Sequence, residues 1–340
     1  MSEPVSEEAS LARSTAGMAA GTIASRALGV VRASLQLAVV GAFLAGDAWD
    51  VANTLPNIVY LLLAGGVLNA VLVPQITRAA SHPDGGREYV DRLLTIAIIG
   101  MAIIAVVFTL GAGLLVRLYS TPNWSADQRS LSTAFALICM PQIFFYGLYT
   151  LLGQVLNARN RFAAYMWAPA VANLVAIAGL AYFLLNYPHR AQIAGWTSPM
   201  IWVLAGSATA GVAAQALVLV VPLWRSGFRF RPRWGFRGVG LGTASTVALW
   251  TFGALVVSTV GFIITSQVLT YAGKAGALAH LVVPGKISYT NAFLIFMLPH
   301  SLVTVSLVTA LFTRMSRAAH AGDLGKVRSD VTKGMLLTAV

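Results

Sequence analysis

The chain has 340 residues, of which 57% are hydrophobic and only 10% charged, and its formal net charge is +12. Soluble domains carry about a quarter charged residues, so this composition excludes a water-soluble fold. Apolar runs of roughly 20 residues follow one another with short polar gaps, whereas a membrane β-barrel would show alternating segments of about 10 residues. The sequence therefore predicts an all-α polytopic membrane protein.

Eight complete transmembrane helices and part of a ninth are predicted along the chain. They occupy about residues 17–40, 50–77, 93–116, 131–156, 163–186, 198–223, 241–271 and 288–313, with the ninth starting near residue 331. The polar start lacks the basic region of a cleaved signal peptide, so we expect the first helix to be retained. Because the chain ends about halfway through the ninth helix, we expect the protein to continue beyond Val340.

The basic residues are unevenly divided between the two sides of the predicted membrane. With the N-terminus in the cytoplasm, 16 of the 23 Lys and Arg residues fall in inside segments, 5 fall outside, and Arg26 and Arg32 lie within the first helix. This bias predicts a cytoplasmic N-terminus and explains the positive charge without nucleic acid. Alternating Arg and aromatic residues at 225–237 could stack on single strands, but a cytoplasmic linker lying on anionic headgroups is the favoured interpretation.

A short internal repeat suggests two related halves. Residues 78–87 align without gaps on residues 317–326, with five of ten positions identical at an offset of 239. Six predicted helices separate the two loops, which indicates two parallel six-helix lobes, although short loops of small residues can also match by chance. The predicted organisation is a cytoplasmic tail (1–16), an N-terminal lobe (17–224), a basic linker (225–240) and the start of a C-terminal lobe (241–340), which is incomplete in this chain.

Arg26 and Arg32 are the strongest functional signal, because an arginine at mid-bilayer costs between about 3 and more than 10 kcal/mol unless it is solvated or paired. None of the eleven acids lies deep in a predicted helix, and only Asp47 and Asp50 could reach these arginines. A cationic cavity that binds a phosphate group is therefore expected, with snorkelling of Arg26 as the alternative. Asp47 and Asp50 flank Trp49, so they either gate the cavity by pairing with Arg32 or form a solvated loop beside an interfacial tryptophan.

Enzyme chemistry is not indicated. The five histidines are scattered without metal-ligand spacing, and no nucleotide-binding or hydrolase motif is present. The single cysteine, Cys139, excludes an intrachain disulfide. A membrane glycosyltransferase would need interfacial carboxylates, which only Asp47 and Asp50 offer. We expect a transporter with no catalytic residue, metal or cofactor.

Several motifs resemble one family. They are Ser-Arg-x-Leu-Gly-x-x-Arg at 25–32, Gly-Asp-Ala-Trp at 46–49, Leu-Pro-Asn at 55–57 and Asn-Arg-Phe at 160–162. From about residue 17 to its end, the chain resembles the MurJ (MviN) lipid II flippases of the MOP exporter superfamily. The resemblance implies a two-lobed, V-shaped transporter of fourteen helices. Such a protein moves an undecaprenyl-pyrophosphate-linked peptidoglycan precursor from the inner to the outer leaflet by alternating access. It also implies that Arg26, Arg32 and Asp47 are required for substrate binding.

The chain departs from the family pattern at two positions. A family arginine after the Leu-Pro-Asn motif corresponds here to Tyr60, and a second one falls in the uncharged region 292–294. Lys274 and Lys286 are the candidates to replace the missing charge. The secondary candidates for substrate binding or gating are thus Asp50, Asn57, Tyr60, Lys274 and Lys286.

The expected location is the bacterial plasma membrane, and the expected partners are lipid II or a similar pyrophosphate lipid, membrane lipids, and cell-wall synthesis or division proteins, but not nucleic acid. Two other functions stay open: an exporter of another lipid-linked oligosaccharide, and a non-transporting scaffold for cell-wall enzymes. A scaffold would tolerate loss of the cavity arginines but not of the cytoplasmic loops.

Overall fold

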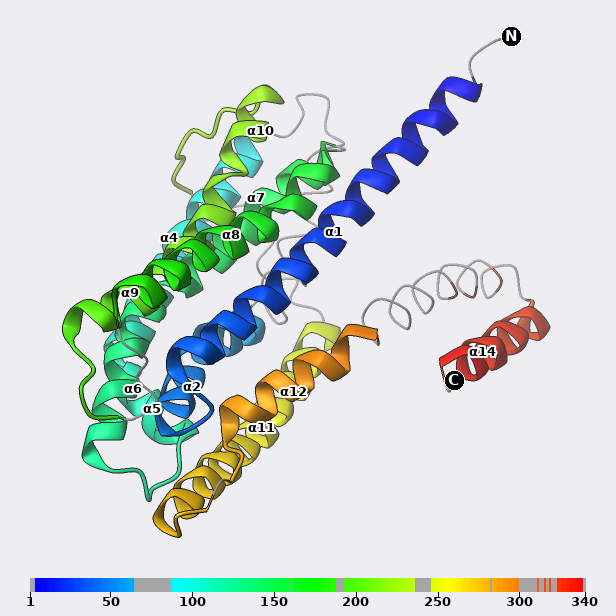
Figure 1. Ribbon diagram of the computed structural model, residues 1–340. Helices are drawn as coiled ribbons and strands as arrows, with labels where there is room; N and C mark the ends of the chain where they lie inside the picture. The colour runs from blue at the N-terminus through cyan, green and yellow to red at the C-terminus, as the bar shows by residue number, and fades with distance from the viewer. Residues whose placement is uncertain are drawn as a thin grey trace. The chain divides into compact units, whose positions relative to one another are not determined.

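The computed structural model describes residues 4–63, 87–159, 161–187, 193–235, 246–281, 283–299 and 323–338, with positions 311, 315 and 318. These residues form helices and their connections, and no strand occurs among them (Figure 1). The chain divides into two compact units, Met1–Ser288 and Tyr289–Val340. Most of the repeat at 78–87 lies outside the described residues, so the two-lobe organisation stays a prediction.

Eleven of the described helices lie wholly or partly in the first unit. They are α1 (Pro4–Val40), α2 (Leu44–Leu63), α4 (Arg87–Leu110), α5 (Ala112–Tyr119), α6 (Ala126–Cys139), α7 (Gln142–Ala158), α8 (Phe162–Asn186), α9 (Ser198–Leu217), α10 (Val220–Arg225), α11 (Thr246–Leu278) and the start of α12 (Lys286–Pro299). The second unit contains the rest of α12 and α14 (Leu324–Thr338), whose start is capped by the Asp323 carboxylate accepting from Lys326 N at 2.9 Å.

Six helical stretches among the described residues are long and apolar enough to cross a membrane. They are Ala20–Val40, Glu88–Leu110, Ala126–Ala158, Ala163–Asn186, Ser198–Arg225 and Phe252–Leu278. Large apolar side chains project outward from them, including Leu110 and Leu185. Exposed leucines on long apolar helices are stable only in a bilayer, so the predicted class of all-α polytopic membrane protein is confirmed.

The helices begin, end and break at positions that differ from the prediction. The stretch predicted at 93–116 is α4 followed by α5, with a break at Gly111, and α11 continues to Leu278 rather than ending near residue 271. The stretch predicted at 131–156 is divided between α6 and α7 at Pro141, which lacks the N–H needed to continue the helix. Thr209 of α9 holds this break by donating to Ile138 O at 2.8 Å.

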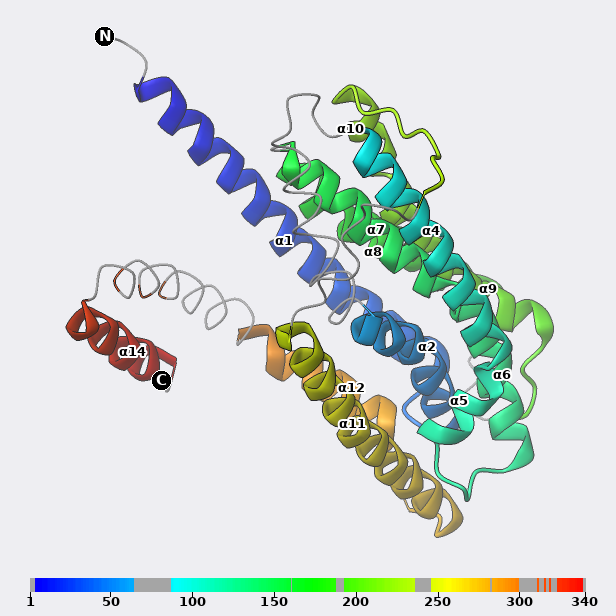
Figure 2. The same cartoon turned by 180° about the vertical axis from the view of Figure 1, so that it is seen from behind.

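The helices of the first unit pack side by side. Figures 1 and 2 show α1 alongside α8, α8 beside α9, and α2 against α6. An aromatic cluster joins α2 to α6, because Phe135 makes edge contacts with Trp49 and Trp196, with ring centroids at 5.4 and 5.2 Å. Trp49 is therefore a buried core residue and not an interfacial tryptophan, which corrects the prediction. Its burial fixes the start of α2, where the acids Asp47 and Asp50 lie.

Candidate functional site

Arg26 and Arg32 lie on α1, which packs mainly against α8 on one of its faces. Arg26 and Arg32 are both half-buried, and they project from the membrane-length part of α1. Helix α8 fixes this part, because Asn173 Nδ2 donates to Ser25 O at 2.8 Å and Trp167 Nε1 donates to Gly17 O at 3.1 Å. The rest of the α1 surface stays largely uncovered by described residues.

Arg32 lacks compensation inside the described part of the chain. Its Nε atom is buried without a hydrogen-bond partner, and none of the described ion pairs includes Arg32. Tyr146 interacts electrostatically with Arg32, and the ring of Tyr146 lies 5.4 Å from that of Tyr60. Tyr60 in turn shares a hydrogen bond of 2.5 Å with Thr150. The electrostatic neighbour of Arg32 among the described residues is thus a neutral phenol and not a carboxylate.

The start of α2 is clamped against the start of α12. Asp47 is buried, and its Oδ1 accepts a hydrogen bond from Ile287 N at 2.9 Å. The free N–H groups of a helix N-terminus favour such a carboxylate. Gly273 and Gly285 allow the approach, because a methyl group on Gly273 would lie 2.7 Å from Asp47 Oδ2, and one on Gly285 would overlap the same carboxylate.

A buried ion pair adjoins this cap. Lys286 Nζ donates to Asp50 Oδ2, and the side chains of both residues are almost fully buried. The same ammonium lies 5.6 Å from the centroid of the Phe262 ring, within reach of a cation–π interaction. We refer to Asp47, Asp50, Lys286 and Ile287 as the α2–α12 clamp. Asp50 Oδ2 and Asp47 Oδ1 thus each have a partner about 240 residues away in sequence, whereas Asp47 Oδ2 has none among the described residues.

Helix α11 is tied to the same end of the unit. Ser266 Oγ donates to Tyr119 O at 2.6 Å, Gln267 Nε2 donates to Leu118 O at 2.8 Å, and Thr121 N donates to Thr270 Oγ1 at 2.9 Å. These contacts join α11 to the end of α5, close to the start of α2 (Figure 1). The clamp and the α11 contacts together close this end of the helices.

The predicted site residues therefore separate into two groups. Asp50 pairs with Lys286 rather than with Arg32, so the predicted pairing with Arg32 is wrong for Asp50, and the burial of both acids excludes a solvated loop. Tyr60 joins α2 to α7. Asn57 is exposed on α2, and Lys274 is half-buried on α11 with no described hydrogen bond. The two glycines beside Asp47 were missed, although the turn-forming Pro-Gly dipeptide before Lys286 marks the connection that holds Gly285.

At the opposite end of the first unit, the basic segment 225–235 folds over α4. Arg231 N donates to Asp91 Oδ1 at 3.3 Å and Arg233 N to Thr95 Oγ1 at 3.1 Å. Glu88 forms ion pairs with Arg92 at 2.6 Å and with Arg233 at 3.0 Å. Arg231 thus contacts α4 through its backbone, and Arg233 contacts α4 through both its backbone and its side chain.

Fold and site define a polytopic α-helical membrane protein with an arginine-bearing helix and one closed helix end. A family model described as lipid II flippase MurJ matches residues 37–340. The chain belongs to the MurJ lipid II flippase family.

Similar proteins agree with this assignment. The chain is 26% identical over 330 residues to a probable lipid II flippase MurJ of Rhizobium meliloti, covering 93% of this chain and 57% of the relative. It is 25% identical over 328 residues to the lipid II flippase MurJ of Burkholderia cenocepacia, covering 93% and 59%. A solved structure titled lipid II flippase MurJ, inward closed conformation, has the same fold, with a TM-score of 0.64, 19% identity, and coverage of 89% of this chain and 59% of that one. The chain spans somewhat more than half the length of these proteins.

Proposed function

We propose that the protein moves lipid II, a pyrophosphate-linked peptidoglycan precursor, from the inner to the outer leaflet of the bacterial plasma membrane by alternating access. The relatives are named for this activity, and the motifs at residues 25–32 and 55–57 agree with it. The distribution of basic residues supports an N-terminus in the cytoplasm.

The uncompensated charge of Arg32 carries the proposal. A buried donor without a partner costs about 1–3 kcal/mol, and more when the group is charged. A bound phosphate group removes that cost, because the planar guanidinium donates two parallel hydrogen bonds to phosphate oxygens. Arg26 lies six residues earlier on the same helix, and we assign it to the same pyrophosphate headgroup. The phenols of Tyr60 and Tyr146 supply neutral polar walls beside it.

The α2–α12 clamp is, in this proposal, the outer closure of the transporter. With the N-terminus inside, α1 ends at the outer surface and α2 begins there, so Asp47 and Asp50 face the periplasmic side. The clamp must separate before a headgroup leaves toward the outer leaflet. We therefore assign Asp47, Asp50 and Lys286 to gating rather than to direct contact with pyrophosphate.

Complementation of cells depleted of their own lipid II flippase tests the assignment. Arg26→Glu and Arg32→Glu should each abolish growth while the protein still accumulates in the membrane, because a carboxylate repels the headgroup. Arg32→Lys should restore growth only in part, since an ammonium keeps the charge but loses the bidentate geometry.

A matched control is Arg225→Glu, which reverses the charge of an exposed arginine at the end of α10. This variant should grow like the wild type. Full growth of both helix-one variants would overturn the site assignment. If only loop variants lost activity, the scaffold function would explain the data better.

A further inference from the structure

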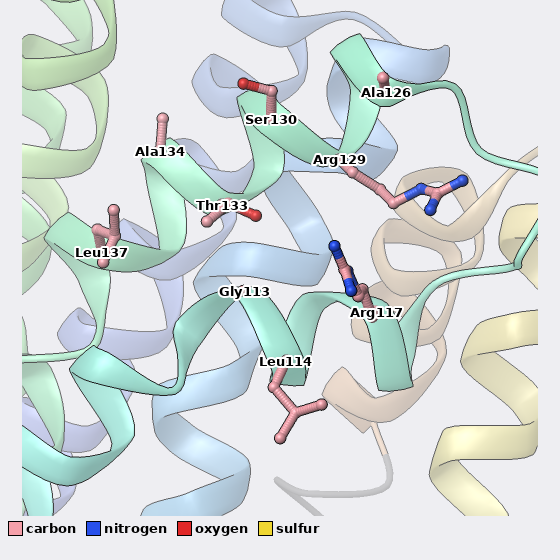
Figure 3. A pocket seen from close by; sticks show the side chains of 9 residues that line it. All are labelled: Gly113, Leu114, Arg117, Ala126, Arg129, Ser130, Thr133, Ala134 and Leu137. Atoms are coloured by element: carbon pink, nitrogen blue, oxygen red, sulfur yellow. The ribbon is translucent and has the colours of Figure 1, made fainter.

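A second cationic site lies between α5 and α6, separate from the helix-one arginines. The two helices line an open pocket of about 710 Å³, which Figure 3 shows from close by. Arg117 and Arg129 lie at one end of this pocket and Leu137 at the other, with Thr133 between them. We call it the α5–α6 pocket. It is polarised, with charge at one end and apolar surface at the other.

Arg129 is positioned by the loop between α5 and α6. Its Nε donates to Trp124 O at 3.2 Å, and its Nη2 donates to Trp124 O at 2.5 Å and to Pro122 O at 3.1 Å. A guanidinium has five N–H donors, so both donors of Nη1 remain available. The carbonyl contacts orient the group without neutralising its charge.

Arg117 contributes a second cation to the same end of the pocket. It is exposed in the last turn of α5, and no described hydrogen bond or ion pair includes it. The nearest acid in sequence, Asp127, is exposed on α6 and does not line the pocket. Two arginines that share a pocket without a carboxylate attract an anion with paired oxygens, such as a phosphate.

The order of the elements places the charged end at headgroup depth. Arg117 precedes the α5–α6 loop by one turn of helix and Arg129 follows it, so both lie where the helices emerge from the membrane. Leu137 lies two turns further along α6, toward the middle of the apolar stretch. Leu114 and Leu137 line the pocket and are exposed, and Leu110, also exposed, ends α4 four residues before Leu114. The arginines thus lie at the membrane surface and the apolar side chains lie deeper. A phospholipid has the same arrangement, with its phosphate at the surface and its acyl chains below.

We propose that the α5–α6 pocket binds the phosphate headgroup of an anionic phospholipid, with its acyl chains along the exposed leucines of α4, α5 and α6. The lipid belongs to the leaflet at the end of the helices where the α2–α12 clamp lies, because α5 contacts α11 at that end. The bound lipid is expected to stiffen the α5–α6 loop, whose carbonyls already hold Arg129.

Native mass spectrometry of the purified protein in non-ionic detergent tests the site with phosphatidylglycerol and phosphatidylcholine as probes. The wild type should retain one more phosphatidylglycerol than the double variant Arg117→Gln, Arg129→Gln, whose affinity should fall by about tenfold or more. Arg117→Gln alone should weaken binding several-fold. Because Arg117 has no described contact, this single variant separates binding from any effect on folding.

A control with the same change of charge is Arg328→Gln, Lys333→Gln, which removes two exposed cations of α14. It should retain phosphatidylglycerol like the wild type. Equal retention by the Arg117 and Arg129 variants, or equal loss in the control, would overturn the proposal. Displacement by millimolar inorganic phosphate would indicate a free-anion site, and a preference for undecaprenyl phosphate over phosphatidylglycerol would indicate a polyprenyl-lipid site. Either result overturns the phospholipid assignment.

Discussion

The two ends of the first unit are both held by ion pairs between distant segments, yet these pairs have different surroundings. At one end, Lys286 and Asp50 have side chains that are 3% and 11% exposed. At the other end, Arg233 and Glu88 have side chains that are 45% and 50% exposed. Removing one partner of a buried pair leaves an uncompensated charge, whereas an exposed partner is solvated by water. The buried pair therefore controls whether its end can stay closed, and the exposed pair only tethers the segment 225–235.

Arg32 differs from both ion pairs. Arg32 is half-buried, whereas Asp50 and Lys286 are almost fully buried, and its Nε has no described partner. The clamp residues find their partners within the chain, so we assign them to closure. The proposed partner of Arg32 is the ligand. Under the proposed function, charge compensation separates the residues assigned to gating from those assigned to binding more sharply than residue type does.

The largest effect is expected for Lys286→Ala, which leaves the Asp50 carboxylate buried without its cation. Breaking a buried pair from one side costs about 3–5 kcal/mol. Thermal or chemical unfolding of the detergent-solubilised protein should show a loss of this size. The double variant Asp50→Asn, Lys286→Met should recover most of it, because no charge is then left unpaired. A double variant as unstable as the single one would contradict the role of the ion pair.

Gly285→Ala should have the next largest effect. An added methyl group overlaps the Asp47 carboxylate, and overpacking of this kind costs about 1–3 kcal/mol. Gly253→Ala is the matched control, because a Cβ at Gly253 meets nothing within 4 Å and alanine favours the interior of α11. The two variants should shift the unfolding transition in opposite directions. A loss of stability in the control as large as in Gly285→Ala would argue against close packing at Asp47.

The sequence predicted the class of fold well, because roughly 20 apolar residues per crossing is a local requirement of the bilayer. It also selected Asp47, Asp50 and Lys286 as candidates. It could not pair them, since Asp50 and Lys286 are separated by 236 positions and no local pattern links α2 to α12.

Two further misses have local causes. Trp49 follows a polar turn, which is typical of an interfacial tryptophan, but Phe135 and its neighbours enclose the indole. The helix breaks at Gly111 and Pro141 occur within continuous apolar runs, so hydropathy alone does not show them. The burial of Arg32 Nε likewise depends on how α1 packs, which composition cannot specify.

Asp47→Ala should cost less than Gly285→Ala. The substitution leaves Ile287 N without its acceptor, but it also removes the buried Oδ2, which has no partner. The two effects offset each other, and a net loss of about 1 kcal/mol is expected. Asp47→Asn keeps an acceptor oxygen and should be nearly neutral in the same unfolding measurement. A large loss in the asparagine variant would show that the charge, rather than the hydrogen bond, holds α12.

The smallest effect is expected for Glu88→Gln at the opposite end. This change removes the ion pairs to Arg92 and Arg233, but both arginines are well exposed and stay hydrated. Exposed pairs contribute about 0.2–1 kcal/mol each, and added salt weakens them. The loss relative to wild type should therefore be at most about 1–2 kcal/mol in low salt and should shrink in 1 M salt. The loss in Lys286→Ala should change little with salt, because water does not reach that pair. If salt reduced both losses equally, the clamp would be as hydrated as the linker, and the distinction between a buried closure and an exposed tether would fail.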